Sequence, residues 1–180
     1  MTEVKLMAIV GSLRTGSVNA GVARAAIAAA VRGVSIEPFD LADVPMYNGD
    51  VEDAGLPASV VAMHEAIAAA DGLLIFSPEY NGSLPAVTKN AIDWMTRPPK
   101  SWEGTAVTMV VTTPGGRAGE SVRGHFETIM GFQPVRLMPT LGIGSYPEKI
   151  TDGELTDEDA LAQVASFVAD FAAFASESSD

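Results

Sequence analysis

The sequence predicts an α/β domain in which five parallel strands form a doubly wound sheet with helices on both faces. Short β-rich apolar runs alternate with longer, mostly alanine-rich stretches of helical character, and this strand–helix rhythm occurs five times. Most strand candidates are apolar throughout, as expected for parallel strands that helices cover on both sides. The length of 180 residues suits one domain.

The first half of the chain supplies three expected strands and two expected helices. The strands are 4–10 (VKLMAIV), 34–39 (VSIEPF) and 72–76 (GLLIF), which are short and rich in apolar residues. The stretches between them, 19–31 and 57–70, are rich in alanine and are expected to be helices. This alternation predicts that each helix connects two parallel strands.

The second half continues the pattern with strands at 106–112 and 134–138 and helices at 85–95, 119–130 and 157–175. The last helix carries apolar residues at helical spacing. At its start, Thr156 and, three residues later, Asp159 resemble a capping box. We therefore assign residues 1–176 to a single domain. The final residues, 177–180, are small, polar or acidic, and are expected to be a frayed tail because they have little to bury.

Composition excludes several classes of function. The chain has 23 acidic and 11 basic residues, and its net charge of −12 would repel nucleic acid and anionic membrane surfaces. It contains no cysteine, which excludes disulfides, thiolate metal sites and iron–sulfur clusters, so any redox chemistry requires a bound cofactor. The apolar run 6–10 is too short for a signal-peptide core. We expect a soluble, cytoplasmic protein.

The loop after the first strand, 11–19, reads GSLRTGSVN and has the composition of an anion site. The free N–H groups of the following helix start, together with hydroxyl groups and the Arg14 guanidinium, are suited to surround a phosphate. The alternative is that Ser17 only caps the helix and Arg14 is only a solvated side chain. From the loop alone, both interpretations stay open.

Two other phosphate-binding motifs do not fit this loop. A Walker loop requires a lysine after its second glycine, and Ser17 stands at that position after Gly16. A dinucleotide fingerprint requires a glycine where Leu13 stands, so close approach to a pyrophosphate is not supported. Nucleotide hydrolysis and dinucleotide binding at this loop are therefore not expected.

The loop after the third strand, 77–85, reads SPEYNGSLP and is suited to hold a planar ring. Pro78 and Pro85 restrict its backbone, Asn81 and Gly82 tolerate positive φ, and Tyr80 offers an aromatic face. The alternative is an ordinary Asn-Gly turn with Tyr80 on the surface.

The two loops together, GSLRTGSVN and SPEYNGSLPAVTKNAIDW, resemble the NADPH-dependent FMN reductase family, which includes quinone, chromate and azo reductases. The resemblance implies a flavodoxin-like, three-layer α/β/α fold with strand order 2-1-3-4-5. It also implies an enzyme with FMN as cofactor and NADPH or NADH as co-substrate. Such an enzyme passes a hydride by a ping-pong mechanism to a small electron acceptor, which would be a quinone, a flavin, or a chromate, azo or nitro compound.

The resemblance assigns cofactor-binding residues in three loops. In the first loop, the residues implied to hold the FMN phosphate are Ser12, Arg14, Ser17, Asn19 and, through its backbone N–H, Val18. In the second, those implied to line the isoalloxazine are Pro78, Glu79, Tyr80, Asn81 and Gly82. The third loop, TTPGGRAG at 112–119, is implied to contribute Thr113, Gly115 and Gly116. Arg117 has no assigned role, and no catalytic side chain is expected because the flavin carries the electron chemistry.

Four further features of the sequence lead to expectations. His64 and His125 lie in expected helices without matching ligands, so we expect solvated side chains and no metal site. The stretch 94–102, WMTRPPKSW, suggests exposed indoles at an interface. By resemblance, that interface implies a homodimer or homotetramer. The turn-rich segment 40–52 resembles the family's segment that borders the substrate pocket.

Two other functions stay open from the sequence. A flavodoxin-type electron carrier would bind FMN without reacting with NAD(P)H, an idea that the acidic charge supports. A nicotinamide-binding Rossmann protein would have no affinity for FMN.

Overall fold

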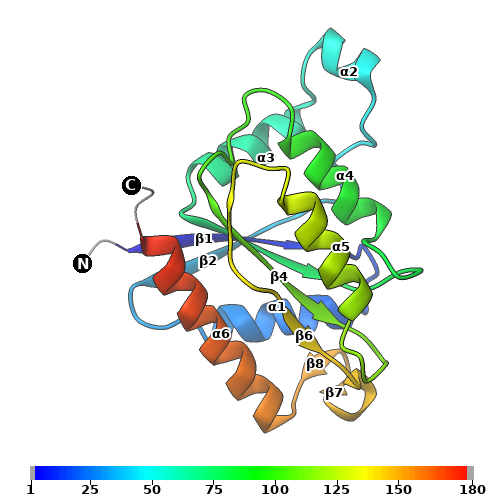
Figure 1. Ribbon diagram of the computed structural model, residues 1–180, viewed down its shortest axis with the longest axis vertical. Coiled ribbons are helices and arrows are strands. Elements are labelled where there is room, and N and C mark those ends of the chain that lie inside the picture. The colour runs from blue at the N-terminus through cyan, green and yellow to red at the C-terminus, as the bar shows by residue number, and fades with distance from the viewer. Residues whose placement is uncertain (1–2, 178–180) are drawn as a thin grey trace.

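The central sheet has the predicted parallel order. The computed structural model describes residues 3–177, and Figure 1 shows its arrangement. The sheet runs β2-β1-β3-β4-β5, and the strands are β1 (Val4–Val10), β2 (Val34–Phe39), β3 (Gly72–Ser77), β4 (Ala106–Thr112) and β5 (Arg136–Leu137). This order confirms the flavodoxin-like fold.

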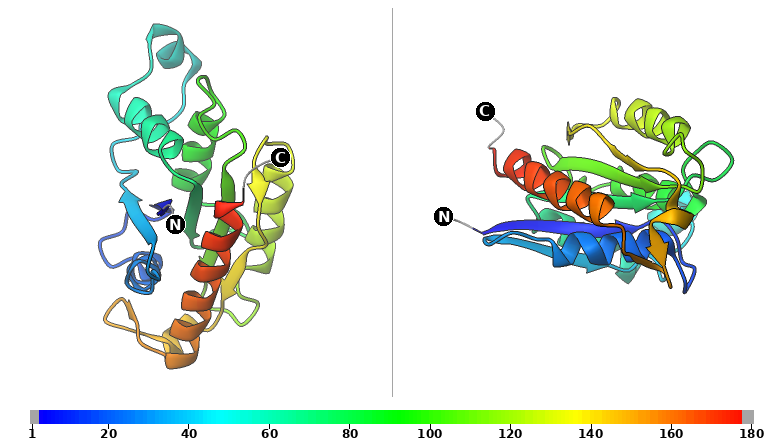
Figure 2. Two further views of the ribbon diagram at one scale, coloured as in Figure 1. Left: turned by 90° about the vertical axis from the view of Figure 1, so that its left-hand side faces the viewer. Right: turned by 90° about the horizontal axis from the view of Figure 1, so that it is seen from below.

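Helices cover both faces of the sheet, which gives the predicted three layers (Figures 1 and 2). One face packs against α1 (Val18–Ala28) and α6 (Glu158–Ser176), and their core residues form one apolar cluster. The other face packs against α3 (Ala58–Ala68), α4 (Ala86–Met95) and α5 (Glu120–Met130), which form the second cluster. Every residue of β3 and β4 is buried, as expected for central strands between two helical layers.

The register of the strands brings three loops to one edge of the sheet. Val10 at the end of β1 aligns with Phe76 of β3, and Ser77 at the end of β3 aligns with Val111 of β4. The backbone N–H of Gly11 donates to the carbonyl of Phe76 at 2.7 Å. The segments that follow β1, β3 and β4 therefore begin side by side.

The predicted fifth strand, 134–138, is wrong in its extent. The structure has two short strands there, β5 and β6 (Leu141–Ile143), and both pair with β4. Pro139 lies between them and has no N–H to donate to a ladder. The carbonyl of Pro139 instead accepts from the Thr108 hydroxyl at 3.1 Å. The proline thus divides a strand that sequence periodicity does not resolve.

Four short elements were not expected from the sequence. They are α2 (Gly49–Ala54), the 3-10 turn η1 (Tyr146–Glu148) and a hairpin of β7 (Ile150–Thr151) with β8 (Glu154–Leu155). Helix α2 projects from the top of Figure 1, buries no residue, and is capped by Asn48. The hairpin packs tightly on α1, where a Cβ on Gly21 would lie 1.9 Å from the carbonyl oxygen of Gly153. Tertiary contact, not a local apolar pattern, holds the hairpin in place.

The end of the chain differs from expectation at its helix cap. Asp157 accepts from the N–H of Ala160 at 2.9 Å, so it caps α6, whereas Thr156 donates to the Lys149 carbonyl. The predicted capping box of Thr156 and Asp159 is therefore wrong. The predicted frayed tail, 177–180, lies outside the described residues except for Glu177.

Two indoles expected at an exposed interface are buried in the core. Trp94 is 0% exposed and Trp102 is 1% exposed, and both belong to the cluster under α3, α4 and α5. The indole N–H of Trp94 donates to the Pro45 carbonyl at 2.8 Å, so a distant loop covers this side chain. The expectation of exposed aromatics at 94–102 is wrong, and the reason is a contact between segments far apart in sequence.

Candidate functional site

The first loop, 11–17, ends at a capped helix start. Ser17 is 5% exposed and its hydroxyl accepts from the N–H of Ala20 at 3.4 Å, which makes it the N-cap of α1. Its own N–H donates to the carbonyl of Arg14 at 3.0 Å. Val18 is the first residue of the helix. Ser17 therefore caps α1, and the same helix start presents free N–H groups at the carboxyl ends of the strands.

Ser12 and Arg14 lie at the open side of this loop. Ser12 is half-buried and Arg14 is exposed. Among the described residues, the Arg14 guanidinium forms no hydrogen bond or ion pair, whereas Arg24 on the next helix pairs with Glu154. An unpaired guanidinium beside a helix N-terminus is suited to hold a dianion.

The start of the first loop touches α4 closely. A Cβ on Gly11 would lie 2.0 Å from the Thr88 hydroxyl oxygen and 3.1 Å from that of Ser77. Thr88 is fully buried in α4, and its hydroxyl lies 3.3 Å from that of Ser77. Glycine is therefore required at position 11 for the loop to pass between β3 and α4.

The second loop, 78–85, contains a tight two-residue turn. The backbones of Tyr80 and Ser83 exchange two hydrogen bonds of 3.0 Å, and Asn81 and Gly82 between them have φ of 53° and 73°. Positive φ at both central residues is the pattern of a type I′ turn, for which Asn-Gly is the preferred sequence. Tyr80 is 53% exposed and does not pack into the protein. The loop therefore contains an Asn-Gly turn, and the ring of Tyr80 is exposed at the carboxyl ends of the strands.

Two side-chain contacts attach this loop to α5. A Glu79 carboxylate oxygen accepts from the N–H of Val122 at 3.1 Å, inside the first turn of α5. The Ser83 hydroxyl lies 2.7 Å from Nδ1 of His125. Sequence reasoning missed both contacts, because they join residues about forty positions apart. His125 is exposed, as predicted.

The third loop, 113–119, closes the same edge. The Thr113 hydroxyl donates to the carbonyl of Gly115 at 3.2 Å, and Gly115 and Gly116 have exposed backbone with no side chain pressed against them. Together with Glu79 the loop lines a cavity of about 270 Å³. Arg117 lines this cavity and is exposed. The third loop and the second therefore share one hollow.

Orphaned polar atoms show that this edge fits a polar ligand. Within residues 3–177, three buried side-chain atoms lack a hydrogen-bond partner, and they are Oδ1 of Asn19, Oγ1 of Thr112 and Nε2 of His64. Asn19 stands in the first turn of α1 and Thr112 at the end of β4, so two of the three lie at the ligand edge of the sheet. Buried polar groups are normally satisfied, so these two fit a polar group supplied from outside the chain.

The loop after β2 also reaches this edge. Tyr47 packs edge-on against Trp94 with ring centroids 5.0 Å apart, and its hydroxyl donates to Glu52 at 2.8 Å. That hydrogen bond raises the pKa of the Tyr47 hydroxyl above its usual value. Met46 beside it is 69% exposed. The segment 40–52 therefore presents apolar side chains near α4, the helix that follows the second loop.

His64 lies away from these loops and is buried, so the expectation of a solvated side chain is wrong. It is 3% exposed, and its Nδ1 lies 2.6 Å from the hydroxyl of Ser101. Burial lowers the pKa of His64 below its ordinary value. The side chain joins α3 to the segment before β4.

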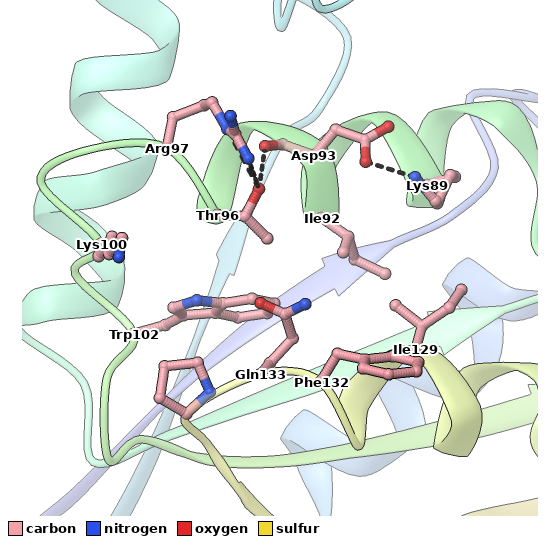
Figure 3. Close-up of a pocket in the computed structure, with 11 residues that line it drawn as sticks. Lys89, Ile92, Asp93, Thr96, Arg97, Lys100, Trp102, Ile129, Phe132 and Gln133 are labelled. Carbon is pink, nitrogen blue, oxygen red and sulfur yellow. Dashed lines mark hydrogen bonds and ion pairs between the residues drawn. The ribbon is translucent and has the colours of Figure 1, made fainter.

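A second cavity, of about 420 Å³, lies between α4 and the segment after α5 (Figure 3). Lys89 pairs with Asp93, and Arg97 donates to the Thr96 hydroxyl at 3.0 Å, on the upper side of this view. Phe132 lines the other side and is 82% exposed. The cavity is separate from the three loops and combines cations with an unpacked aromatic ring.

Two properties of residues 3–177 bear on other functions. No helix there is both long and apolar enough to cross a membrane. No three or more His, Asp or Glu side chains in this part of the chain are grouped so as to bind a metal ion. The cytoplasmic location stays a prediction.

Comparison with known proteins places these loops in context. The chain matches the NADPH-dependent FMN reductase family over residues 4–146. An NAD(P)H-dependent FMN reductase of Pseudomonas aeruginosa is 42% identical over 117 residues, and the aligned part makes up 65% of this chain and 63% of that protein. The quinone reductase of Escherichia coli strain K12 is 36% identical over 167 residues, or 88% of each chain.

A solved structure agrees with the sequence match. The flavoenzyme FerB of Paracoccus denitrificans, an NAD(P)H:(acceptor) oxidoreductase, has a TM-score of 0.85 and 30% identity, covering 96% of this chain and 97% of FerB. The family match includes all three loops and confirms the predicted resemblance, the class of enzyme and the cofactor, FMN with NAD(P)H. The chain belongs to the NADPH-dependent FMN reductase family.

Proposed function

We propose that the three loops at the carboxyl ends of β1, β3 and β4 hold FMN, through which a hydride from NAD(P)H reaches a small electron acceptor. The observation that carries this proposal is the meeting of these loops beside two orphaned buried polar atoms, on Asn19 and Thr112. Ligands of doubly wound sheets bind at this edge, where the strand order reverses. FMN supplies the hydride-carrying chemistry, and the protein supplies position and electrostatics.

The first loop is the proposed phosphate site. Arg14 is exposed and unpaired among the described residues, and it stands beside the N-terminus of α1. The hydroxyl of Ser12, the capped Ser17, the N–H of Val18 and the buried amide of Asn19 complete the set. Charge, free N–H groups and hydroxyls together match a phosphate dianion.

The second and third loops are the proposed ring site. The backbone of the second is stiffened by Pro78 and by the type I′ turn at Asn81 and Gly82, and Glu79 fixes it to α5. Tyr80 offers an exposed aromatic face. In the third loop, Thr113, Gly115 and Gly116 present hydroxyl and open backbone groups without bulky side chains. The second loop is rigid and the third has no bulky side chains, so we expect one face of the flavin ring to stay accessible.

The proposed acceptors are a quinone, a flavin, or a chromate, azo or nitro compound. Three exposed apolar side chains on separate loops of this edge, Leu13, Met46 and Tyr80, favour a planar apolar acceptor such as a quinone. Similar proteins named as quinone reductases support the same choice. We propose that NAD(P)H and the acceptor occupy one place in turn, which gives ping-pong kinetics.

A steady-state panel of acceptors tests this function on the FMN-loaded full chain. Each acceptor class is offered with NADPH and separately with NADH, and loss of nicotinamide absorbance is followed. Turnover with parallel double-reciprocal lines supports the proposal. Tight FMN binding without turnover would instead identify a flavodoxin-type electron carrier, and absence of FMN binding would favour a nicotinamide-binding protein without flavin.

We also propose that the chain forms a homodimer or homotetramer. The two tryptophans are buried, and the support is instead the cavity of Figure 3, which the exposed Phe132 lines on one side and the cations Arg97 and Lys100 line elsewhere. Exposed aromatic and arginine side chains are enriched at protein interfaces. Light scattering of the purified protein is expected to give twice the chain mass or more, and a monomeric mass would contradict it.

A further inference from the structure

An irregular segment after β2 is held by an unusually complete set of side-chain contacts. The strap, residues 44–48, has no regular secondary structure. The Asn90 amide donates through Nδ2 to the Pro45 carbonyl at 2.9 Å and accepts through Oδ1 from the N–H of Tyr47 at 2.7 Å. Trp94, one turn further along α4, donates to the same carbonyl at 2.8 Å. Side chains of α4 therefore bind backbone groups of the strap that, in a β-strand, a neighbouring strand would bind.

The side chain of Tyr47 adds a second layer of contacts. Its ring packs edge-on against Trp94, lies 5.6 Å from the Arg97 guanidinium, and its hydroxyl is bound by Glu52. Tyr47 is nevertheless 37% exposed. These contacts fix the backbone of the strap and the ring of Tyr47, while part of that ring and about two thirds of Met46 stay open to solvent.

The position of Asn90 connects the strap to the proposed flavin site. Helix α4 begins directly after the second loop, and its first turn contains Thr88, which touches Gly11 of the first loop. Asn90 is 4% exposed and stands two residues further on. The strap follows β2, the neighbour of β1 in the sheet. One short stretch of α4 thus contacts the first loop and the strap, and continues from the second loop.

We infer that Asn90 is a positioning residue that holds the strap as a fixed wall of the acceptor site, so that Met46 and Tyr47 limit the size of the acceptor. This inference rests on the proposed function. A carboxamide is the side chain that offers a donor and an acceptor at once, as the Pro45 carbonyl and the Tyr47 N–H require. Loss of Asn90 leaves Trp94 on the Pro45 carbonyl but removes the side-chain partner of Tyr47.

The test compares two quinones, one with a single ring and one with two fused rings, on FMN-loaded protein. In Asn90→Leu, which keeps the number and branching of the side-chain heavy atoms but loses both hydrogen bonds, the wall loosens. We expect the ratio of kcat/KM for the larger over the smaller quinone to rise about three- to ten-fold, mainly through KM. Asn90→Asp keeps one acceptor and loses the donor, so a smaller rise is expected.

A matched control separates positioning from general loss of stability. Thr108→Val also removes a buried hydrogen bond to a proline carbonyl, that of Pro139, but on the face of the sheet opposite α4. It is expected to lower Tm and to leave the quinone ratio unchanged. If Asn90→Leu does not fold, Met46→Ala, at an exposed position of the strap, is expected to raise the same ratio.

The outcomes distinguish the two proposals. An active wild-type enzyme whose quinone ratio is unchanged in both Asn90→Leu and Met46→Ala would overturn the role of Asn90 and the strap, while leaving the proposed function intact. A wild-type protein that reduces no quinone with NADPH or NADH would contradict the proposed function, and the inference about the strap with it.

Discussion

At the scale of single residues, Arg14 is the most testable part of the proposed phosphate site in the first loop. Arg14 is the cation of this loop, and it forms no ion pair within the described part of the chain. In a protein of net charge −12, an unpaired cation at one edge gives that edge a distinct local potential. The contribution of Arg14 is therefore measurable as binding energy for FMN.

We predict that Arg14→Ala weakens FMN binding by roughly 1.5 to 3 kcal/mol, as for loss of a charge-assisted hydrogen bond. The matched control is Arg32→Ala, which removes the same charge from an exposed position before β2, at the opposite edge of the sheet. Titration of the apoprotein with FMN measures both. Equal affinities for the two variants would remove Arg14 from the phosphate site.

Two glycines of the same loop differ in the space around them. A side chain at Gly11 would collide with the buried Thr88, whereas a Cβ on Gly16 meets nothing within 4 Å. We predict that Gly11→Ala lowers the free energy of unfolding by about 1 to 3 kcal/mol, and that Gly16→Ala changes it by no more than about 0.5 kcal/mol. Urea unfolding of the apoprotein measures the pair, and equal midpoints would show that the close approach at Gly11 is absent in solution.

His64 links stability to pH. Because burial lowers its pKa in the folded state, the unfolded chain takes up a proton first as the pH falls below the ordinary value of 6.5. The free energy of unfolding therefore decreases from about pH 6.5 down through the folded pKa, below which this loss is complete. His64→Gln is expected to have a smaller decrease over that range in urea unfolding at several pH values. A curve parallel to that of the wild type would contradict a buried neutral imidazole.

Prediction from sequence named residues in three loops that the structure brings together, but it missed the contacts that these residues make. Thirteen cofactor-site residues were assigned to three loops, and the structure places these loops at one edge of the sheet. The roles of Glu79 and Asn90 and the burial of Trp94 were missed. Each depends on a contact across about forty or more positions, and nothing in the local pattern of residues encodes the distance between such segments.

At the scale of elements, the connection between the second loop and α5 is the feature most open to test. The Glu79 carboxylate binds a free N–H in the first turn of α5, where the helix dipole also favours a negative charge. The N-cap residue of this helix, Gly119, has no side chain to do so. Glu79 thus caps a helix from a different loop and stiffens that loop in return.

We predict that Glu79→Ala lowers the free energy of unfolding by about 1 kcal/mol, the usual cost of a lost cap, and also weakens FMN binding because the second loop becomes less rigid. Glu120→Ala serves as the control, since it removes an exposed carboxylate at the same helix start, and this carboxylate accepts no hydrogen bond within residues 3–177. Its effect is expected to stay within about 0.5 kcal/mol. Urea unfolding and FMN titration measure both variants. Equal stabilities and equal FMN affinities of Glu79→Ala and Glu120→Ala would contradict the role of Glu79 as a cap.

The elements that could be predicted are the long ones with a periodic apolar face. Four strands and five helices lie within a few residues of the expected ranges. The division of β5 from β6, the polar helix α2 and the β7–β8 hairpin were not predicted. They are two to six residues long, so they present no periodic signal, and proline, capping and packing on α1 determine them instead.

At the scale of the whole molecule, the strand order explains why the site lies where it does. The order places β2 on one side of β1 and β3 on the other, and ligands of doubly wound sheets bind where the strand order reverses in this way. We propose that residues 1–176 act as one domain built around this sheet. Two apolar core clusters, one on each face, hold the helices against the sheet. Because the loops connect these helices and strands, their positions depend on the packing of the whole domain.

The central claim is that the three loops at this edge would hold FMN, which would supply the chemistry for hydride transfer from NAD(P)H to an acceptor. Its most direct test is an anaerobic double-mixing experiment on FMN-loaded protein, first with NADPH and then with a quinone. The account predicts that the visible absorbance of the bound flavin bleaches in the first mix and returns in the second. A bound flavin that stays oxidised in the presence of NADPH would contradict the account and identify an electron carrier.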